Sequence, residues 1–517
     1  MRNYLLILIL LISVGFSKAT NWIDINDNGL IENEVSIVSQ DETTTVINYK
    51  INSYSLNKVR TTEGDAFVVN SPNCTKLLEH GAPDLPKLTN SLIIPDNAKM
   101  QIEILTSSFI EVNDINIAPS KGNLLRTVDP SQVPYYYGAE YLQDSFFPQD
   151  LAQLRKPYIL RDYRGQTVVF NPFQYNPITK TLRIYTDVTL KVETTSQKAE
   201  NTLDRSTAPK KLSKEFQNIY QKHFLNFDKS KYTSTAEEGS IIVICHSDFI
   251  EPIQPYVDWK IQKGIETDLV ELSTIGSSAT AIKTYIENQY STKNVVYILL
   301  VGDAGYVPTI SASAGDSDNS YGFMTGNDHY PELFVGRFSA ETVDHVQTMV
   351  ERVIDYELYA DATATHHETS IGIASSQGPG DDNEMDYEHI RNMHTDLLAY
   401  TYTAVTENFD GSQGGLDASG NPSASMVATD INAGCGNILY TGHGSNTAFS
   451  SSGFSNTNVN NLTNTGKLPF IWSVACVNGN FVSTTCFGEA WTRATHNNQP
   501  SGAIAALMAT INQSWDP

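Results

Sequence analysis

The second half of the chain contains a series of short, almost uninterrupted apolar runs, and this series restricts the fold more than any other feature. Strands that are apolar along their whole length are buried on both faces, as in a parallel sheet that helices cover on each side. Two stretches with helical periodicity, residues 278–290 and 344–360, lie between such runs. We therefore predict an α/β fold with open, mostly parallel sheets covered by helices. The runs cover residues 241–246, 295–303, 333–338, 371–375, 438–444, 469–476 and 503–510.

Polar or reactive residues follow some of these runs at the point where each strand should end. Asp303, His443 and Cys476 stand at such positions. In open parallel sheets, ligands bind beyond the carboxyl ends of the strands. The sequence therefore predicts that these three residues share one active-site rim.

The first part of the chain has a different pattern, which predicts a separate β-rich domain. From residue 20 to about residue 200, short segments rich in β-branched and aromatic residues alternate with Pro, Gly and Asn turns. A Lys-, Ser- and Thr-rich linker follows at residues 195–239, with a short helical stretch at residues 214–225. Exposed linkers are common sites of proteolysis, so Arg205 and Lys231 are candidate cleavage sites.

Charge and the N-terminal pattern restrict the partners of the chain. Asp and Glu total 58 against 34 Lys and Arg, a formal net charge of −24, which argues against a nucleic-acid partner. An apolar run at residues 4–16 follows a basic residue and precedes the small residues Ser17 and Ala19. This pattern is typical of a cleaved signal peptide, here residues 1–19, and the run is too short to span a membrane. We expect an exported protein without an integral membrane segment.

The chain has five cysteines, an odd and sparse set for an exported protein. Such a set is not typical of a disulfide scaffold and leaves at least one thiol free. Burial as a small apolar residue is the favoured interpretation for Cys245 and Cys435. Cys476 differs, because it ends an apolar run and precedes the turn-forming pair Asn478 and Gly479.

His443 is the candidate base for Cys476. A thiol has an unperturbed pKa of about 8.5 and needs a nearby base to become a nucleophilic thiolate at neutral pH. His443 lies between two glycines at another strand end, and the N–H groups of Gly444 and Cys476 would form an oxyanion hole. The alternatives at this point are a structural histidine in a Gly-rich turn and a buried, inert cysteine.

Several long blocks around the candidate pair match those of a known family. They are residues 256–264, 297–303, 326–339, 440–445, 468–479 and 509–515. Through them, residues 238–515 closely resemble the catalytic domain of the gingipains, cysteine peptidases with a caspase–haemoglobinase-like fold. The resemblance implies a catalytic domain at residues 232–517, built from two subdomains and incomplete at its C-terminal end. Residues 81–86 and 171–177 resemble the family's inhibitory propeptide, which would occupy residues 20–231 together with the linker.

The resemblance also implies how a basic side chain is bound. The family's nucleophile and base fall on Cys476 and His443, and an Asp in an acidic tract selects Arg or Lys by charge pairing. Asp386 stands at the matching position of this chain. Trp515 matches an aromatic residue that roofs the same pocket, where it would stack on a guanidinium. A solvated acidic loop or a calcium ligand is the alternative for Asp386.

One position departs from the family pattern. The family has a carboxylate shortly after the strand at residues 371–375, whereas this chain has Gln377. A glutamine can orient the imidazole of His443 by hydrogen bonding, but it would stabilise the imidazolium less than a carboxylate does. A neighbouring acid such as Asp381 is the alternative.

The resemblance further implies a latent precursor. Relatives are cut after a basic residue at the position of Lys231, and Arg205 is the alternative site. Their propeptides usually place a basic side chain in the specificity pocket, for which Arg126 is the candidate.

We therefore expect the secreted zymogen of a cysteine endopeptidase that cleaves after Arg or Lys through an acyl-enzyme. Its partners would be protein or peptide substrates and its own propeptide, and catalysis would need no cofactor. The acidic composition is compatible with structural calcium, but the sequence assigns no metal ligands. The alternatives are a Cys-His amidase or transpeptidase, and a surface protein whose peptidase domain has lost its activity, for which Gln377 is the one sign.

Overall fold

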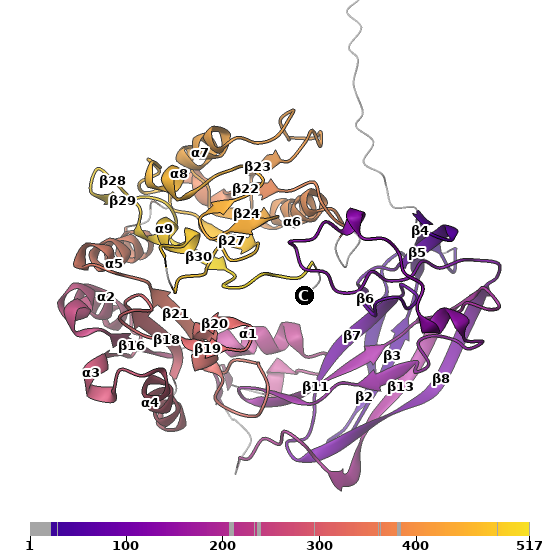
Figure 1. The fold of residues 1–517 in the computed structure, drawn as a ribbon. Coiled ribbons are helices and arrows are strands. Elements are labelled where there is room, and N and C mark those ends of the chain that lie inside the picture. Colours follow the sequence, from indigo (N-terminus) through magenta and orange to yellow (C-terminus); the bar gives the residue numbers. More distant parts are fainter. Residues whose placement is uncertain are drawn as a thin grey trace, which may run out of the picture.

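The computed structural model consists of two parts that lie side by side, a β-rich part and an α/β part (Figure 1). The predicted signal peptide, residues 1–19, lies outside the described residues. Within the described chain, no helix is both long and apolar enough to cross a membrane. The structure describes residues 22–27, 29–205, 211–231, 233–234, 239–293, 295–359, 361, 363–379, 384–482 and 484–515.

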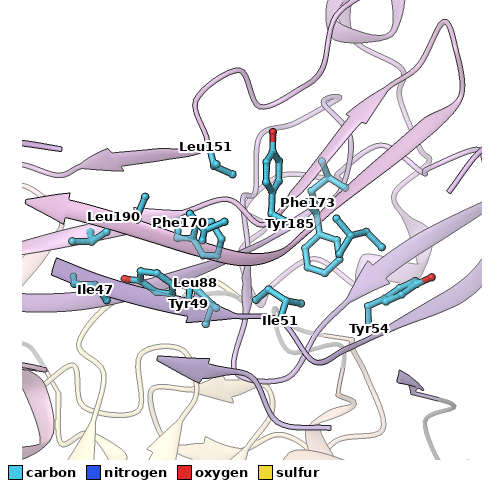
Figure 2. Close-up of a cluster of buried hydrophobic side chains, with 14 of the residues drawn as sticks. Ile47, Tyr49, Ile51, Tyr54, Leu88, Leu151, Phe170, Phe173, Tyr185 and Leu190 are labelled. Carbon is cyan, nitrogen blue, oxygen red and sulfur yellow. The ribbon is translucent and has the colours of Figure 1, made fainter. Parts of the chain in front are cut away.

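The β-rich part consists of antiparallel strands whose inward side chains fill one core. In β3 (Thr44–Lys50), Thr45, Ile47 and Tyr49 are buried, and the residues between them are less so, as the alternation of side chains along a strand requires. Figure 2 shows Ile47 and Tyr49 near Phe170, in a core to which both main sheets contribute. The β-rich fold predicted for this region is confirmed.

The described strands of this part form three sheets. One contains β12 (Phe173–Asn176), β13 (Thr181–Lys198), β3 and β2 (Glu34–Gln40), with β8 (Ala98–Val112) beside β13. The second contains β10 (Tyr158–Leu160), β11 (Tyr163–Phe170), β7 (Pro86–Ile93) and β6 (Thr75–Lys76), with β9 (Ala152–Leu154) beside β11. The third contains β1 (Ile23–Asp24), β4 (Ser53–Thr61) and β5 (Gly64–Asn70).

The linker contains the helix α1 (Lys214–His223), at the place where the sequence predicts a short helical stretch. Ser213 begins this helix by accepting a hydrogen bond from the N–H of Phe216. Phe216 and Tyr220 are buried in a cluster that joins Tyr158 of the β-rich part to Phe334 of the α/β part. One face of this portion of the linker is therefore packed between the two parts, whereas Gln221 and Lys222 are exposed, as the sequence predicts for the linker. A short parallel pair, β14 (Lys211–Leu212) and β15 (Thr233–Ser234), flanks it.

The α/β part begins with a four-stranded parallel sheet that helices cover on both faces (Figure 1). Side chains of alternate residues along β16 (Ser240–Cys245) pack against α2 (Ile250–Gln262) and α5 (Val343–Leu358) on one face and against α4 (Ala279–Thr292) on the other. The remaining strands are β17 (Thr267–Glu271), β18 (Val295–Val301) and β21 (Phe334–Phe338). The helices are α2 (Ile250–Gln262), α3 (Leu272–Ile275), α4 (Ala279–Thr292) and α5 (Val343–Leu358).

A second parallel sheet has the strand order β23-β22-β24-β27-β30. Its strands are β22 (Thr369–Ala374), β23 (Ala404–Phe409), β24 (Asn437–Thr441), β27 (Phe470–Val474) and β30 (Ala505–Met508). Its helices are α6 (Asp386–Tyr400), α7 (Ala424–Ala433), α8 (Asn456–Asn460) and α9 (Phe487–Arg493). Short hairpins complete this part: β19 (Ile310–Ala312) with β20 (Gly315–Ser317), β25 (Gly444–Ser445) with β26 (Ala448–Phe449), and β28 (Thr495–His496) with β29 (Gln499–Pro500).

Helices cover the two faces of this second sheet unequally. On one face, α7, α8 and α9 pack against β22, β24 and β27, whereas α6 packs on the other face against β22 and β24. Beyond α6, the side chains of Phe470, Trp472 and Val474 on β27 and of Leu507 on β30 remain exposed. The α/β fold with mostly parallel sheets and helices is confirmed, but this stretch is covered on one face only among the described residues.

Asp303 does not share a sheet with His443 and Cys476, so the single rim predicted from the sequence is wrong. It follows β18 of the first sheet, whereas the other two follow β24 and β27 of the second sheet. The Asp303 carboxylate accepts hydrogen bonds from the N–H groups of Gly305 and Tyr306, which stabilise its own turn.

The buried His394 on α6 makes the stability of the second sheet depend on pH. Its Nε2 lies 3.3 Å from the Ser370 hydroxyl, and its Nδ1 has no hydrogen-bond partner among the described residues. Burial lowers the pKa of His394 to about 4, and Glu407 and Arg391 act on this pKa in opposite directions. The unfolded chain therefore binds this proton more readily than the folded chain does.

This contribution to stability is fully present above the ordinary histidine pKa of about 6.5. We expect the free energy of unfolding to fall by up to roughly 3 kcal/mol between pH 6.5 and pH 4. Denaturant titrations across this range would measure the fall, and His394→Gln, which cannot titrate, should show less of it. The same fall in both proteins would contradict this assignment.

Candidate active site

The register of two neighbouring strands places His443 and Cys476 at the same edge of the second sheet. Thr441 at the end of β24 is the partner of Val474 at the end of β27. His443 and Cys476 each lie two residues beyond these partners, so both chains leave the sheet side by side. Cys476 is buried and His443 is partly buried. A thiol and an imidazole at adjacent strand ends are suited to nucleophilic catalysis.

Gly444 allows the turn after His443 to lie directly against the turn after Cys476. An ideal Cβ at Gly444 would lie 2.5 Å from the Cys476 carbonyl oxygen and 2.9 Å from the Ala475 Cβ. Only a residue without a side chain fits such a close approach of two backbones. The glycine that the sequence identifies for its free N–H is therefore also required by packing.

Gln377 contacts the imidazole of His443 from the third neighbouring strand. It follows β22, and its Oε1 lies 2.6 Å from the Nε2 of His443. A carbonyl oxygen only accepts, so Nε2 carries the hydrogen and Nδ1 remains free to take a proton. Asp381, the alternative partner, lies outside the described residues.

Asp386 and Trp515 enclose the side chain of Arg126. Asp386 begins α6 and is buried, and its Oδ1 accepts a hydrogen bond of 2.9 Å from Nη1 of Arg126. The hydroxyl of Ser375 donates to the other carboxylate oxygen at 2.5 Å. The guanidinium carbon of Arg126 lies 4.5 Å from the Trp515 ring centroid, a cation–π arrangement.

Electrostatics in this pocket favour a cationic occupant. Burial raises the pKa of Asp386, whereas the positive charge of Arg126 and the hydrogen bonds from Ser375 and Arg126 act in the opposite direction. Without a cation, a buried carboxylate is expensive to keep ionised. The pocket therefore binds a guanidinium by charge and by stacking together.

The backbone around Arg126 pairs with the chain before Trp515 as an added strand would. The N–H of Arg126 donates to the Gln513 carbonyl, and the N–H of Trp515 donates to the Leu124 carbonyl, both at 2.8 Å. An antiparallel bridge joins Leu125 to Ser514. Extended peptides commonly bind in this way at a strand edge. Residues 124–126 therefore lie along residues 513–515 as a bound peptide would, and the chain then turns, with the N–H of Val128 donating to the Leu125 carbonyl at 2.9 Å.

The two predicted cleavage residues occupy different settings. Arg205 makes a two-point ion pair with Asp96, with distances of 2.7 and 3.0 Å, and most of its side chain is shielded. This contradicts the accessible position that the sequence predicts for Arg205. Lys231 ends a short 3-10 helix, Lys229–Lys231.

Among the described residues, no group of three or more His, Cys, Asp or Glu side chains is arranged to hold a metal ion. Most of the acidic tract before Asp386, residues 380–383, is not described. Structural calcium therefore stays an untested prediction.

Comparison with known proteins identifies the family. A model of peptidase family C25 matches residues 234–516, and a model of the C25 propeptide matches residues 29–232. The chain belongs to peptidase family C25. The family resemblance inferred from the sequence blocks is confirmed.

Curated relatives of this C25 chain are longer than it is. Gingipain R1 of Porphyromonas gingivalis is 38% identical over 486 residues, which are 92% of this chain and 48% of the relative. Gingipain R2 of Porphyromonas gingivalis strain W83 is 37% identical over 491 residues, 93% of this chain and 65% of the relative. Lys-gingipain of the same organism is 24% identical over 492 residues, 90% of this chain and 27% of the relative. The chain thus spans about half the length of gingipain R1.

Two solved structures match at a TM-score of 0.50. The complex of the Porphyromonas gingivalis RgpB pro- and mature domains is 36% identical and covers 54% of this chain and 65% of that one. The crystal structure described as the Arg specific cysteine proteinase gingipain R is 35% identical. The match covers 55% of this chain and 66% of that one.

Sequence reasoning missed several groups of the C25 site. The Ser375 hydroxyl donates a hydrogen bond to the Asp386 carboxylate. Ser375 follows the end of β22 just as His443 follows the end of β24, so its position after a predicted strand could have identified this serine. Asp410 follows β23, and burial, with Asp386 and Asp417 nearby, raises its pKa to about 6. Asn478 was interpreted only as a turn former.

The close approach at Gly444 gives a direct test of the site geometry. We expect Gly444→Ala to force the two turns apart and to slow the reaction of Cys476 with iodoacetamide at least ten-fold. Gly336→Ala is a matched control, because an added Cβ there meets nothing within 4 Å. Equal alkylation rates in the wild type and in both variants would contradict the packing described.

Proposed function

We propose that this chain is the zymogen of a secreted cysteine endopeptidase that cleaves peptide bonds after arginine. The observation that carries the proposal is the position of Arg126, whose guanidinium is paired with Asp386 and stacked on Trp515, and the Trp515 ring in turn lies 6.2 Å from the imidazole of His443. Membership of peptidase family C25 supports the peptidase class.

The planar fork of arginine fits this pocket better than the point charge of lysine. A guanidinium can bond a carboxylate and stack on an aromatic ring at the same time, whereas an ammonium is compact and strongly hydrated. The identity of 37–38% to the R gingipains against 24% to Lys-gingipain supports the same choice.

In the proposed mechanism, Nδ1 of His443 takes the proton of the Cys476 thiol, while Gln377 holds the opposite ring nitrogen. The thiolate attacks the carbonyl carbon of the residue in the pocket, and the N–H groups of Gly444 and Cys476 stabilise the oxyanion. His443 returns the proton to the leaving amine as the peptide bond breaks. Water, deprotonated by His443, then hydrolyses the acyl-enzyme and restores the thiol.

Residues 124–128 would keep the zymogen latent by occupying the site as a substrate does. Release would begin with a cut in the linker. Cleavage at Arg205 requires its ion pair with Asp96 to open, which favours Lys231 as the site. An arginine-specific enzyme would need another peptidase to cut after that lysine.

A comparison of peptides that end in Arg, Lys or Ala, each carrying a fluorogenic leaving group, tests the reaction. After limited trypsin treatment, and after the trypsin has been blocked with a serine-protease inhibitor, we expect hydrolysis after Arg that is absent in Cys476→Ala. Asp386→Asn should lower kcat/KM for the Arg peptide at least a hundred-fold, because a desolvated charge pair contributes several kcal/mol. Transfer of the acyl group to an added amine in preference to water would indicate a transpeptidase. An unreactive Cys476 would indicate a domain without activity.

The role of Arg126 in latency has a separate test. Arg126→Ala removes the pocket contacts, so we expect activity to appear at a lower degree of trypsin cleavage than in the wild type. The control is Arg60→Ala, because Arg60 is an exposed arginine of the same β-rich part. Identical activation curves for Arg126→Ala and Arg60→Ala would rule out this form of latency.

A further inference from the structure

Asn478 is a fully buried polar residue in the turn after Cys476 that the proposed chemistry does not use. Its Nδ2 donates to the carbonyl oxygens of Ser445 at 2.6 Å and Ala448 at 3.0 Å. Its Oδ1 accepts a hydrogen bond of 3.0 Å from the hydroxyl of Ser473. Both ends of the amide are therefore bonded.

These three partners belong to the two segments that carry the candidate catalytic residues. Ser445 and Ala448 form the hairpin of β25 and β26, which starts directly after His443. Ser473 is in β27, three residues before Cys476. The Asn478 side chain thus joins the His443 turn to the Cys476 strand across the narrow contact at Gly444.

The backbone next to Asn478 adopts a conformation that needs outside support. Val477 has a φ of 51°, in the left-handed region that β-branched residues rarely adopt. Such a conformation persists only where surrounding contacts hold it. The N–H of Val477 donates to the Ile511 carbonyl at 3.0 Å, and that of Gly479 to the Ala509 carbonyl at 2.8 Å. The turn is fixed on one side by residues 509–511 and on the other by Asn478.

We propose that Asn478 is a positioning residue that fixes the approach of His443 to Cys476. This inference rests on the proposed function, in which these two residues exchange a proton. An asparagine suits the role because one nitrogen supplies two donors and the oxygen accepts. An aspartate of the same shape would direct an acceptor at two buried carbonyl oxygens, so the two turns would separate. Misplacement of a catalytic group by about 1 Å is enough to slow a reaction about a hundred-fold.

The test separates positioning from general stability with a matched asparagine. Asn464 is also buried, donates from Nδ2 to the carbonyl oxygens of Lys467 and Gly502, and accepts from the N–H of Gly502. It precedes β27, at the opposite end of that strand from Cys476. Asn478→Asp and Asn464→Asp therefore break equivalent bonds at equivalent burial. Ser473→Ala, which removes one bond without adding charge, is the third variant.

The full chain, treated with limiting trypsin, is assayed on the Arg peptide for kcat and KM. Alkylation of Cys476 by iodoacetamide is followed against pH, with Cys476→Ser as the blank, and thermal unfolding is recorded. We expect Asn478→Asp to lower kcat at least thirty-fold with KM changed less than three-fold, because Asp386 and Trp515 are untouched. Alkylation should also need a higher pH. Ser473→Ala should lower kcat about three-fold, and Asn464→Asp should lower the Tm with kcat unchanged.

A kcat within two-fold of the wild type in Asn478→Asp, or equal losses of kcat in Asn478→Asp and Asn464→Asp, would overturn the positioning role. If Asn478→Asp does not fold, an unchanged kcat in Ser473→Ala overturns it and the expected loss supports it. Absence of Cys476-dependent hydrolysis in the wild type would refute the proposed function instead. In that case the alkylation profiles of the same variants still decide whether Asn478 sets the contact between imidazole and thiol.

Discussion

The in-register pairing of β24 with β27 is the constraint on which the site depends. Side chains alternate along a strand, so a shift of one residue would turn one of the two following segments to the other face. With Thr441 opposite Val474, His443 and Cys476 leave the sheet at the same level. The neighbour β22 delivers Gln377 to the far side of the imidazole. The order of strands in the sheet is thus also the order of the groups Gln377, His443 and Cys476.

The buried pair of Arg126 and Asp386 links latency to the stability of the precursor. Moving two charges out of water is unfavourable, and their attraction offsets this only when both are present. Ser375 bonds the remaining carboxylate oxygen, and Trp515 covers the guanidinium. A substrate arginine would replace Arg126 without leaving the carboxylate unpaired. Under the proposed function, the buried carboxylate would therefore be paired in two situations, with the propeptide or with a substrate.

Much of the architecture follows from local sequence patterns, because apolar runs of strand length separated by helices favour parallel sheets. The division into two sheets does not follow, and Asp303 was misplaced for that reason. Local sequence patterns also do not predict contacts between segments that are far apart in the chain. Asp96 lies 109 residues from Arg205 and shields it, and no local pattern reveals this. Arg126 and Asp386 are 260 residues apart, and the family resemblance alone suggested their meeting. In the sequence, Asn478 looks like an ordinary turn residue, because its three side-chain hydrogen bonds form only in the folded site.

The segment of residues 124–128, which occupies the site, makes cleavage of the linker and opening of the site two separate events. Its contacts are to Gln513, Ser514, Trp515 and Asp386, and none of these four residues belongs to the linker near Lys231. A cut after Lys231 would therefore leave these contacts intact. Under the proposed function, the time between cleavage and the first turnover would be set by the rate at which this segment dissociates. Such latency would act as a delay fixed by a dissociation rate, which a higher concentration of the activating peptidase would not shorten.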